Sequence, residues 1–186
     1  DVEVLIDAHG HYNVATAVRL GNRLYDESKI DWFEEPCPPE GVDALRSVRQ
    51  QLRAPMCTGE RLFTRWDYSR ILQEGLTDFI MPDVTWTGGI SETKKIATMA
   101  ETYYIPISPH NAQGPGQIMA GAHVSMSTPN FYRLEHALDF KPGYDRYMTE
   151  PFNWQGNKLV LNGKPGLGTD LDMDAVRADL HPDWVV

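Results

Sequence analysis

The feature that most constrains this fold is a regular alternation of short apolar runs and longer amphipathic stretches. Six runs have the length and composition of buried strands, at residues 2–7, 30–34, 54–59, 78–83, 104–109 and 131–135. Between them, apolar residues recur at helical spacing, as over residues 14–25 and 90–103. Strands that alternate with helices predict a parallel sheet, because each return to the start of the next parallel strand needs a long crossover.

Polar residues follow these runs, and their distribution favours a barrel over an open sheet. One candidate functional residue closes or follows each run: Asp7, Glu34, Glu60, Asp83, His110 and Glu135. In a parallel (β/α) barrel the carboxyl ends of all strands meet at one mouth, whereas an open sheet gathers ligand residues only at its switch point. No Gly-rich phosphate fingerprint follows the first run. Six units cannot close an eight-stranded barrel, so we expect two further strands on the N-terminal side.

The chain divides into two segments by composition. Residues 1–140 are predicted to form the partial (β/α) barrel that carries the active-site residues. Residues 141–186 are rich in Gly and Pro and hold only the short strand candidate KLVL, which indicates a cap or edge segment.

Charge and hydropathy point to small-molecule chemistry. The 186 residues carry a net charge of −9, a poor match for nucleic acid or an anionic membrane. No apolar run approaches the roughly 18 residues of a membrane span, and the N-terminus lacks a signal pattern, so a cytoplasmic location is expected. Cys37 and Cys57 fit no disulfide or metal motif and are expected to be reduced packing residues.

Three of the acids are spaced as metal ligands would be. Glu34 follows Asp7 by 27 residues and Glu60 follows Glu34 by 26, one strand-helix unit each. Three carboxylates converging on one mouth repel one another unless a cation lies between them, and oxygen ligands favour Mg²⁺. Glu34 and Glu35 point to opposite faces of a strand, and spacing alone does not decide which one faces the cation.

Six motifs in order resemble those of the enolase superfamily, and within it the mandelate racemase-like acid-sugar dehydratases that act on galactonate or gluconate. They are DAH (7–9), FEEP (33–36), TGE (58–60), MPD…GG (81–89), SPHN (108–111) and LE (134–135). The resemblance implies a (β/α) barrel of enolase-superfamily type, here strands 3 to 8 only, whose C-terminal segment joins a cap domain. It also implies that Asp7, Glu34 and Glu60 bind Mg²⁺, while Glu35 supports them from the other face.

Two of the six histidines are candidate proton-transfer groups. Asp83 and His110 end neighbouring strand units and can form a dyad, in which the carboxylate fixes the imidazole tautomer. His9 follows Asp7 by two residues, so both face one side if the strand continues through residue 9. His123, His136 and His181 are expected to be structural, with His136 turned away from Glu135 by strand alternation.

The resemblance assigns roles to these groups. His110 is the base that removes the C2 proton, His9 is the acid that expels the C3 hydroxyl, and Glu135 hydrogen-bonds the substrate carboxylate. The racemases and many other relatives use a lysine from a strand that would precede this chain. Arg61, Asn111 and Trp86 adjoin these positions and could line the pocket, but nothing in the sequence distinguishes them from surface residues.

The predicted function is Mg²⁺-dependent dehydration of an acid sugar to a 2-keto-3-deoxy acid through an enediolate. Two alternatives stay open: a racemase or cycloisomerase of the same superfamily, or a non-catalytic fragment or ligand-binding relative. We expect an acid sugar as the small-molecule partner, and neither nucleic acid nor a membrane. The full-length chain is expected to form a homo-oligomer. An N-terminal part is expected to precede residue 1.

Overall fold

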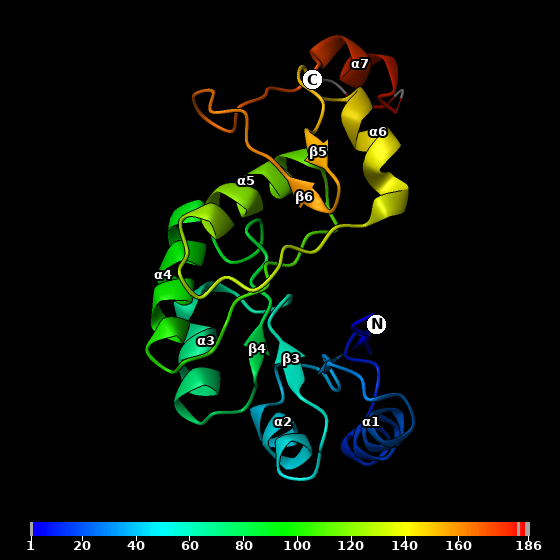
Figure 1. The fold of residues 1–186 in the computed structure, drawn as a ribbon, viewed down its shortest axis with the longest axis vertical. Helices are drawn as coiled ribbons and strands as arrows, with labels where there is room; N and C mark the ends of the chain where they lie inside the picture. The colour runs from blue at the N-terminus through cyan, green and yellow to red at the C-terminus, as the bar shows by residue number, and fades with distance from the viewer. Residues whose placement is uncertain (1, 182, 185–186) are drawn as a thin grey trace.

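A curved parallel sheet covered by helices on its outer side forms the framework of the molecule (Figure 1). The structure is a computed structural model, and it describes residues 2–181 and 183–184. Among these residues, four strands pair in chain order: β1 (Leu5–Asp7), β2 (Trp32–Glu34), β3 (Met56–Thr58) and β4 (Phe79–Ile80). The predicted α/β architecture with a parallel sheet is confirmed.

The last two predicted strands are present as single bridges. Ile107 pairs in parallel with Ile80 on one side and with Phe131 on the other, which continues the arc by two positions. All six positions therefore lie in the predicted order, although each paired stretch is shorter than the apolar run that predicted it. The apolar runs extend beyond the paired residues because loop residues at the strand ends are also buried.

Helices connect the strands and pack against the outer face of the sheet. They are α1 (Val14–Ser28), α2 (Val42–Arg49), α3 (Thr64–Gln73), α4 (Ile90–Glu101) and α5 (Pro115–Met126). Consecutive helices contact one another along the arc, α1 with α2, α3 with α4 and α4 with α5. The main core lies between this helical layer and the strands, and Phe33, Leu45 and Tyr68 are fully buried there.

Helix α1 shows how local sequence sets this packing. The Asn13 side chain accepts a hydrogen bond from the Thr16 amide at 2.9 Å and caps the helix. Ala17 and Gly21 form the buried face, and Lys29, the residue after the helix, adopts the left-handed conformation (φ 52°). A small residue is required at Gly21, because a Cβ there would lie 2.8 Å from Phe33 Cδ1.

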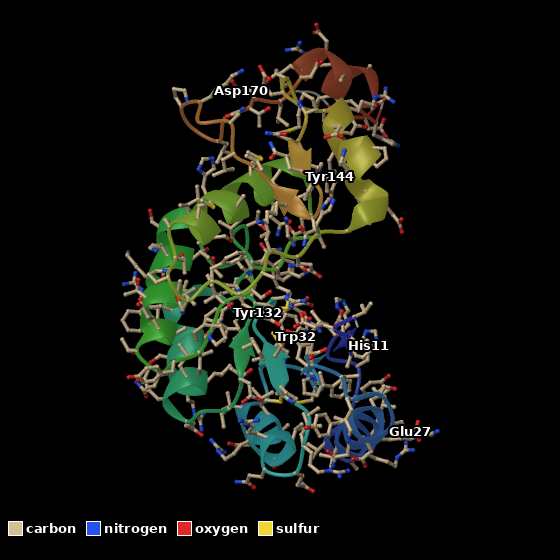
Figure 2. All side chains as sticks on the ribbon, in the orientation of Figure 1. His11, Glu27, Trp32, Tyr132, Tyr144 and Asp170 are labelled. Atoms are coloured by element: carbon tan, nitrogen blue, oxygen red, sulfur yellow. The ribbon has the colours of Figure 1, made fainter. Side chains whose placement is uncertain are left out.

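The inner face of the sheet carries a second apolar cluster. Trp32, Cys57 and Met81 are buried there. The ring of Tyr132 lies 6.2 Å from that of Trp32 and 5.2 Å from that of Phe79; Trp32 and Tyr132 are labelled near each other in Figure 2. Side chains from both ends of the arc therefore fill its interior. Cys37 and Cys57 are buried free thiols, as predicted.

The C-terminal segment continues past the arc with short elements. They are η1 (Leu138–Phe140), α6 (Lys141–Arg146), an antiparallel pair β5 (Trp154–Gln155) and β6 (Lys158–Leu159), and α7 (Met173–Ala178). Met148 and Phe152 pack against Ile118 and Met119 of α5, which attaches the segment to the helical layer. The KLVL candidate is confirmed as a strand at its first two residues. No helix in the described ranges is both long and apolar enough to pass through a bilayer.

Replacing Gly21 with valine should destabilise the protein by about 2 kcal/mol, the usual scale for overpacking a filled core. The new Cβ would fall 2.5 Å from Leu52 Cδ1 as well as against Phe33. The midpoint of urea unfolding of the full-length protein measures the effect. Arg19→Val, at an exposed position of the same helix, is the matched control and should change stability by only a few tenths of a kcal/mol. Equal midpoints for the two variants would contradict the packing account.

Candidate active site

The six predicted functional residues lie at or just beyond the carboxyl ends of the sheet. Asp7 and Glu34 close β1 and β2 and are partners in the parallel register. Glu60 follows β3 by two residues, and Asp83 follows β4 by three. His110 and Glu135 follow the bridges at Ile107 and Phe131. The parallel arrangement thus brings these side chains to one edge, as the spacing predicts.

Glu60 lies between the two candidate histidines. His9 Nδ1 is 3.1 Å from Glu60 Oε1, and His110 Nε2 is 3.2 Å from Glu60 Oε2. The Glu60 side chain is only 5% exposed. His110 Nε2 also lies 3.6 Å from Glu135 Oε2, so one imidazole nitrogen faces two carboxylates. The two candidate histidines therefore meet at a single buried acid.

The predicted dyad is present. His110 Nδ1 lies 2.7 Å from Asp83 Oδ2, and the Asp83 side chain is fully buried. Burial acts to raise the pKa of Asp83, but hydrogen bonds from His110 and Thr85 outweigh it and the pKa is lowered. For His110, burial acts to lower the pKa, while the Asp83 hydrogen bond and the charges of Glu135 and Glu60 raise it overall.

His9 reaches the site by a different route from the one predicted. The strand ends at Asp7, and His9 adopts the left-handed conformation with φ 50°. Its backbone amide donates to Asp7 Oδ1 at 2.6 Å, a local turn that an Asp side chain favours. Strand alternation is therefore the wrong reason for the position of His9, although the ring still lies 3.5 Å from Asp7 Oδ2.

His136 is also placed by something other than strand alternation. No strand is present at residues 135–136, so the predicted reason for its orientation is wrong. Its ring packs on Trp154, with 4.7 Å between centroids. Burial lowers the pKa of His136, and Lys141 lowers it further. This histidine is a packing residue, and His123 lies half-buried in the last turn of α5.

The adjacent glutamates have separate partners. Glu34 lies among acids, and burial followed by the charges of Asp7, Glu135 and Glu60 raises its pKa to about 9. Glu35 is fully buried and forms an ion pair with Arg61, whose Nε donates to Glu35 Oε2 at 2.7 Å. Burial raises the pKa of Glu35 to about 7, although the hydrogen bond from Arg61 lowers it.

The donor atoms at the mouth suit a divalent cation. One ligand atom each from Asp7, His9 and Glu60 lie within 4.8 Å of one another. Asp7 and Glu60 belong both to this group and to the predicted set of ligands. The third member is His9 in this group and Glu34 in the predicted set. A cation beside these groups would offset the repulsion that raises the pKa of Glu34. All-oxygen ligation favours Mg²⁺, whereas an imidazole ligand suits transition metals better.

A cavity of about 160 Å³ extends from the mouth into the arc. Three apolar residues line it together with five polar residues, which are Asp7, Glu34, Ser108, Arg133 and Glu135. The backbone amide of buried Asn111 donates to Glu135 Oε2 at 2.8 Å and orients that acid toward the mouth. Asn111 and Arg61, which had no distinguishing sequence signal, are thus supports of acids at the site. Trp86 stacks on Phe63, with 5.6 Å between the ring centroids.

Sequence reasoning missed Thr85 and Gln117. The Thr85 amide and hydroxyl both donate to Asp83 Oδ1, at 2.7 and 2.5 Å. Gln117 Nε2 donates to Asp83 Oδ2 at 2.6 Å. A Gln in the first turn of a helix is a recognised capping signal and could have drawn attention to residue 117, but its bond to Asp83 depends on tertiary packing.

Arg61→Met should destabilise the full-length protein by about 3 kcal/mol, because it leaves the carboxylate of Glu35 buried without a cation. The double variant Glu35→Gln/Arg61→Met should recover part of that loss, since the amide carries no charge. Urea unfolding midpoints measure both. Arg53→Met, which breaks the exposed pair with Asp26, is the control and should cost less than about 1 kcal/mol. If Arg61→Met costs no more than Arg53→Met, the ion pair does not have this role.

Comparisons with known proteins agree with this geometry. The family model described as enolase C-terminal domain-like matches residues 1–175. D-xylonate dehydratase from Haloferax volcanii is 34% identical over 96% of this chain and 43% of its own length. D-galactarolactone cycloisomerase from Agrobacterium fabrum is 34% identical over 98% of this chain and 50% of its own length.

A solved structure gives the same result. The mandelate racemase/muconate lactonizing enzyme-like protein from Rubrobacter xylanophilus superposes with a TM-score of 0.89 at 36% identity, over 97% of this chain and 46% of that protein. The chain thus spans half or less of the length of the proteins it matches.

Proposed function

We propose, on the premise that this chain belongs to the enolase C-terminal domain-like family, that the full-length protein dehydrates an acid sugar to a 2-keto-3-deoxy acid. The observation that carries the proposal is the placement of His9 and His110 on opposite oxygens of Glu60. Two histidines at one carboxylate-lined mouth supply the base and the acid that elimination of water requires. Similarity to D-xylonate dehydratase supports this reaction class.

His110 is the proposed base. Its Nδ1 is held by Asp83, so Nε2 is the nitrogen that faces the mouth and accepts the C2 proton. The electrons of the C2–H bond move toward the substrate carboxylate and form an enediolate. The two nearby carboxylates, Glu60 and Glu135, stabilise the imidazolium that results.

His9 is the proposed acid. The enediolate electrons then form the C2–C3 double bond while the C3–O bond breaks, and His9 gives a proton to the departing hydroxyl so that it leaves as water. The resulting enol tautomerises to the 2-keto acid. His9 is the more exposed histidine, with 57% of its side chain accessible against 13% for His110, and this places it where water can depart.

The remaining acids bind the cation and the substrate. Asp7, Glu34 and Glu60 would hold Mg²⁺, which when bound supplies positive charge to the substrate carboxylate as negative charge develops on it. Glu135, positioned by Asn111, would hydrogen-bond that carboxylate. We further propose that the chain supplies barrel strands 3 to 8, with residues 1–140 as barrel and 141–186 against a cap domain, in a homo-oligomer. Coverage of 43–50% of its relatives supports an additional N-terminal part.

A second candidate is cycloisomerisation, which the similarity to D-galactarolactone cycloisomerase favours. That reaction would use His110 in the same way but would release no water. The product distinguishes the two, because only dehydration lowers the mass of an aldonate by one water.

Mg²⁺ binding to the full-length protein, measured by calorimetry, should weaken at least about tenfold in Glu34→Gln, a loss of about 1.4 kcal/mol. The reason is that Glu34 faces Asp7 and Glu60, whereas Glu35 faces Arg61. Glu35→Gln should bind within a few-fold of the parent. The reverse order would show that the other glutamate of the pair is the ligand.

The two histidines should separate proton exchange from elimination. His110→Asn should abolish both dehydration and exchange of the C2 proton with D₂O, since both need the base. His9→Asn should abolish dehydration and leave exchange measurable, since His110 can form the enediolate and return a proton. Each loss should be at least about 10²-fold.

Proton NMR of a panel of aldonates in D₂O reads both outcomes. His11→Asn, an exposed histidine whose ring lies 5.5 Å from that of His9, is the control and should retain both activities. Normal dehydration by the His9 variant would remove His9 from the mechanism.

A further inference from the structure

We infer that the mouth offers a second set of metal ligands, Asp7, His9 and Glu60, which takes Zn²⁺ in place of Mg²⁺ and thereby inhibits the enzyme. The inhibitory effect rests on the proposed function and deepens it, whereas the binding of Zn²⁺ does not depend on it. Asp7 and Glu60 belong to both ligand sets, so the two ions compete. The third ligand separates them, since it is Glu34 for Mg²⁺ and His9 for Zn²⁺.

The donor atoms of the second set are spaced like ligands of one tetrahedral ion. His9 Nδ1 lies 3.1 Å from Glu60 Oε1 and 3.5 Å from Asp7 Oδ2. Zn²⁺ binds imidazole nitrogen and carboxylate oxygen at about 2.0–2.1 Å, so two of its tetrahedral ligands lie about 3.3 Å apart. The two measured distances fall on either side of that value. The three side chains therefore need only small shifts to surround a zinc ion.

The other oxygen of each acid already has a partner. Asp7 Oδ1 accepts a hydrogen bond from the His9 backbone amide at 2.6 Å, and Glu60 Oε2 lies 3.2 Å from His110 Nε2. Asp7 Oδ2 and Glu60 Oε1 are left facing the imidazole of His9. Arg61 Nε lies 3.4 Å from Glu60 Oε1, farther away than the imidazole nitrogen. One oxygen of each acid is thus available to an ion that His9 also binds.

The backbone at His9 is held in the conformation that this set needs. Its φ of 50° lies in the left-handed region, which is uncommon for residues other than glycine. The hydrogen bond from its amide to Asp7 fixes the turn. Because of this turn, a side chain that follows β1 reaches Glu60, which follows β3, across the intervening strand β2. Residues in sparsely populated backbone conformations cluster at functional sites.

The chemistry of the third ligand selects the ion. Carboxylate oxygens suit Mg²⁺ and Mn²⁺, whereas an imidazole suits Zn²⁺. The His9 side chain is 57% exposed and Glu34 is 5% exposed, so the second set opens to solvent and leaves room for water as a fourth ligand. Zn²⁺ bound there would take two of the three ligands that Mg²⁺ needs and would hold His9 away from the leaving hydroxyl.

The test measures Zn²⁺ and Mg²⁺ binding separately by calorimetry, with the full-length protein and its variants. His9→Asn should weaken Zn²⁺ binding at least about tenfold, a loss of about 1.4 kcal/mol, and leave Mg²⁺ binding within about threefold of wild type. Glu34→Gln should show the opposite order, with a larger loss for Mg²⁺ than for Zn²⁺. Asn adopts left-handed φ readily, so His9→Asn keeps the local turn. His11→Asn, at the neighbouring exposed histidine, is the control and should leave both affinities unchanged.

Competition and the position of the ion complete the test. Zn²⁺ added to the Mg²⁺-loaded protein should release one Mg²⁺ for each Zn²⁺ bound and stop dehydration of a reactive aldonate, and excess Mg²⁺ should restore it. Anomalous diffraction at the zinc edge should show a peak bonded to His9 Nδ1.

Three results would overturn the inference. They are Zn²⁺ binding to His9→Asn within about threefold of wild type, a zinc peak at the mouth that does not contact His9, and simultaneous binding of Zn²⁺ and Mg²⁺ without competition. Failure of every aldonate to react, with Zn²⁺ binding still dependent on His9, would instead overturn the proposed reaction and leave the second ligand set in place.

Discussion

The repulsion among Asp7, Glu34, Glu60 and Glu135 is the constraint on which the rest of the site depends. Parallel pairing brings these acids to one edge, and the burial of Glu34 and Glu60 leaves those two carboxylates little water to screen their charges. Burial and, after it, the charges of Asp7, Glu135 and Glu60 raise the pKa of Glu34. Each neighbouring basic group compensates part of this charge: Arg61 pairs with Glu35 and lies 3.4 Å from Glu60, and both candidate histidines contact Glu60. A divalent cation at the mouth would complete the same balance.

The scaffold provides the rigidity that such a cluster needs. Apolar side chains fill both faces of the sheet, and Gly21 lets helix α1 approach Phe33 closely. The acids themselves are on strand ends or on short loops whose backbone is hydrogen-bonded to the next unit. For example, the Gly10 amide donates to the Glu35 carbonyl at 2.7 Å. The energetic cost of gathering the acids is therefore offset by packing elsewhere in each strand-helix unit.

Much of this arrangement could be predicted from the sequence, because it follows from periodicity. The strand-helix alternation gave the parallel order, and the 27-residue spacing of Asp83 and His110 predicted their contact. The lengths of the strands could not be predicted from the apolar runs. At the last two strand positions, Ile107 and Phe131 form only single bridges. The position of His9 was predicted from strand alternation, whereas an Asp side-chain turn produces it.

Contacts between distant residues were the least predictable. Gln117 donates a hydrogen bond to Asp83, which lies 34 positions earlier in the sequence. Arg61 binds Glu35 and not Glu34, two adjacent glutamates that strand alternation alone could not tell apart.

Anomalous diffraction from crystals of the full-length protein grown with Mn²⁺ tests the central claim most directly. The account predicts one anomalous peak at the mouth, bonded to oxygens of Asp7, Glu34 and Glu60. A peak bonded to His9 with Glu34 outside its coordination, or no peak at the mouth, would contradict it.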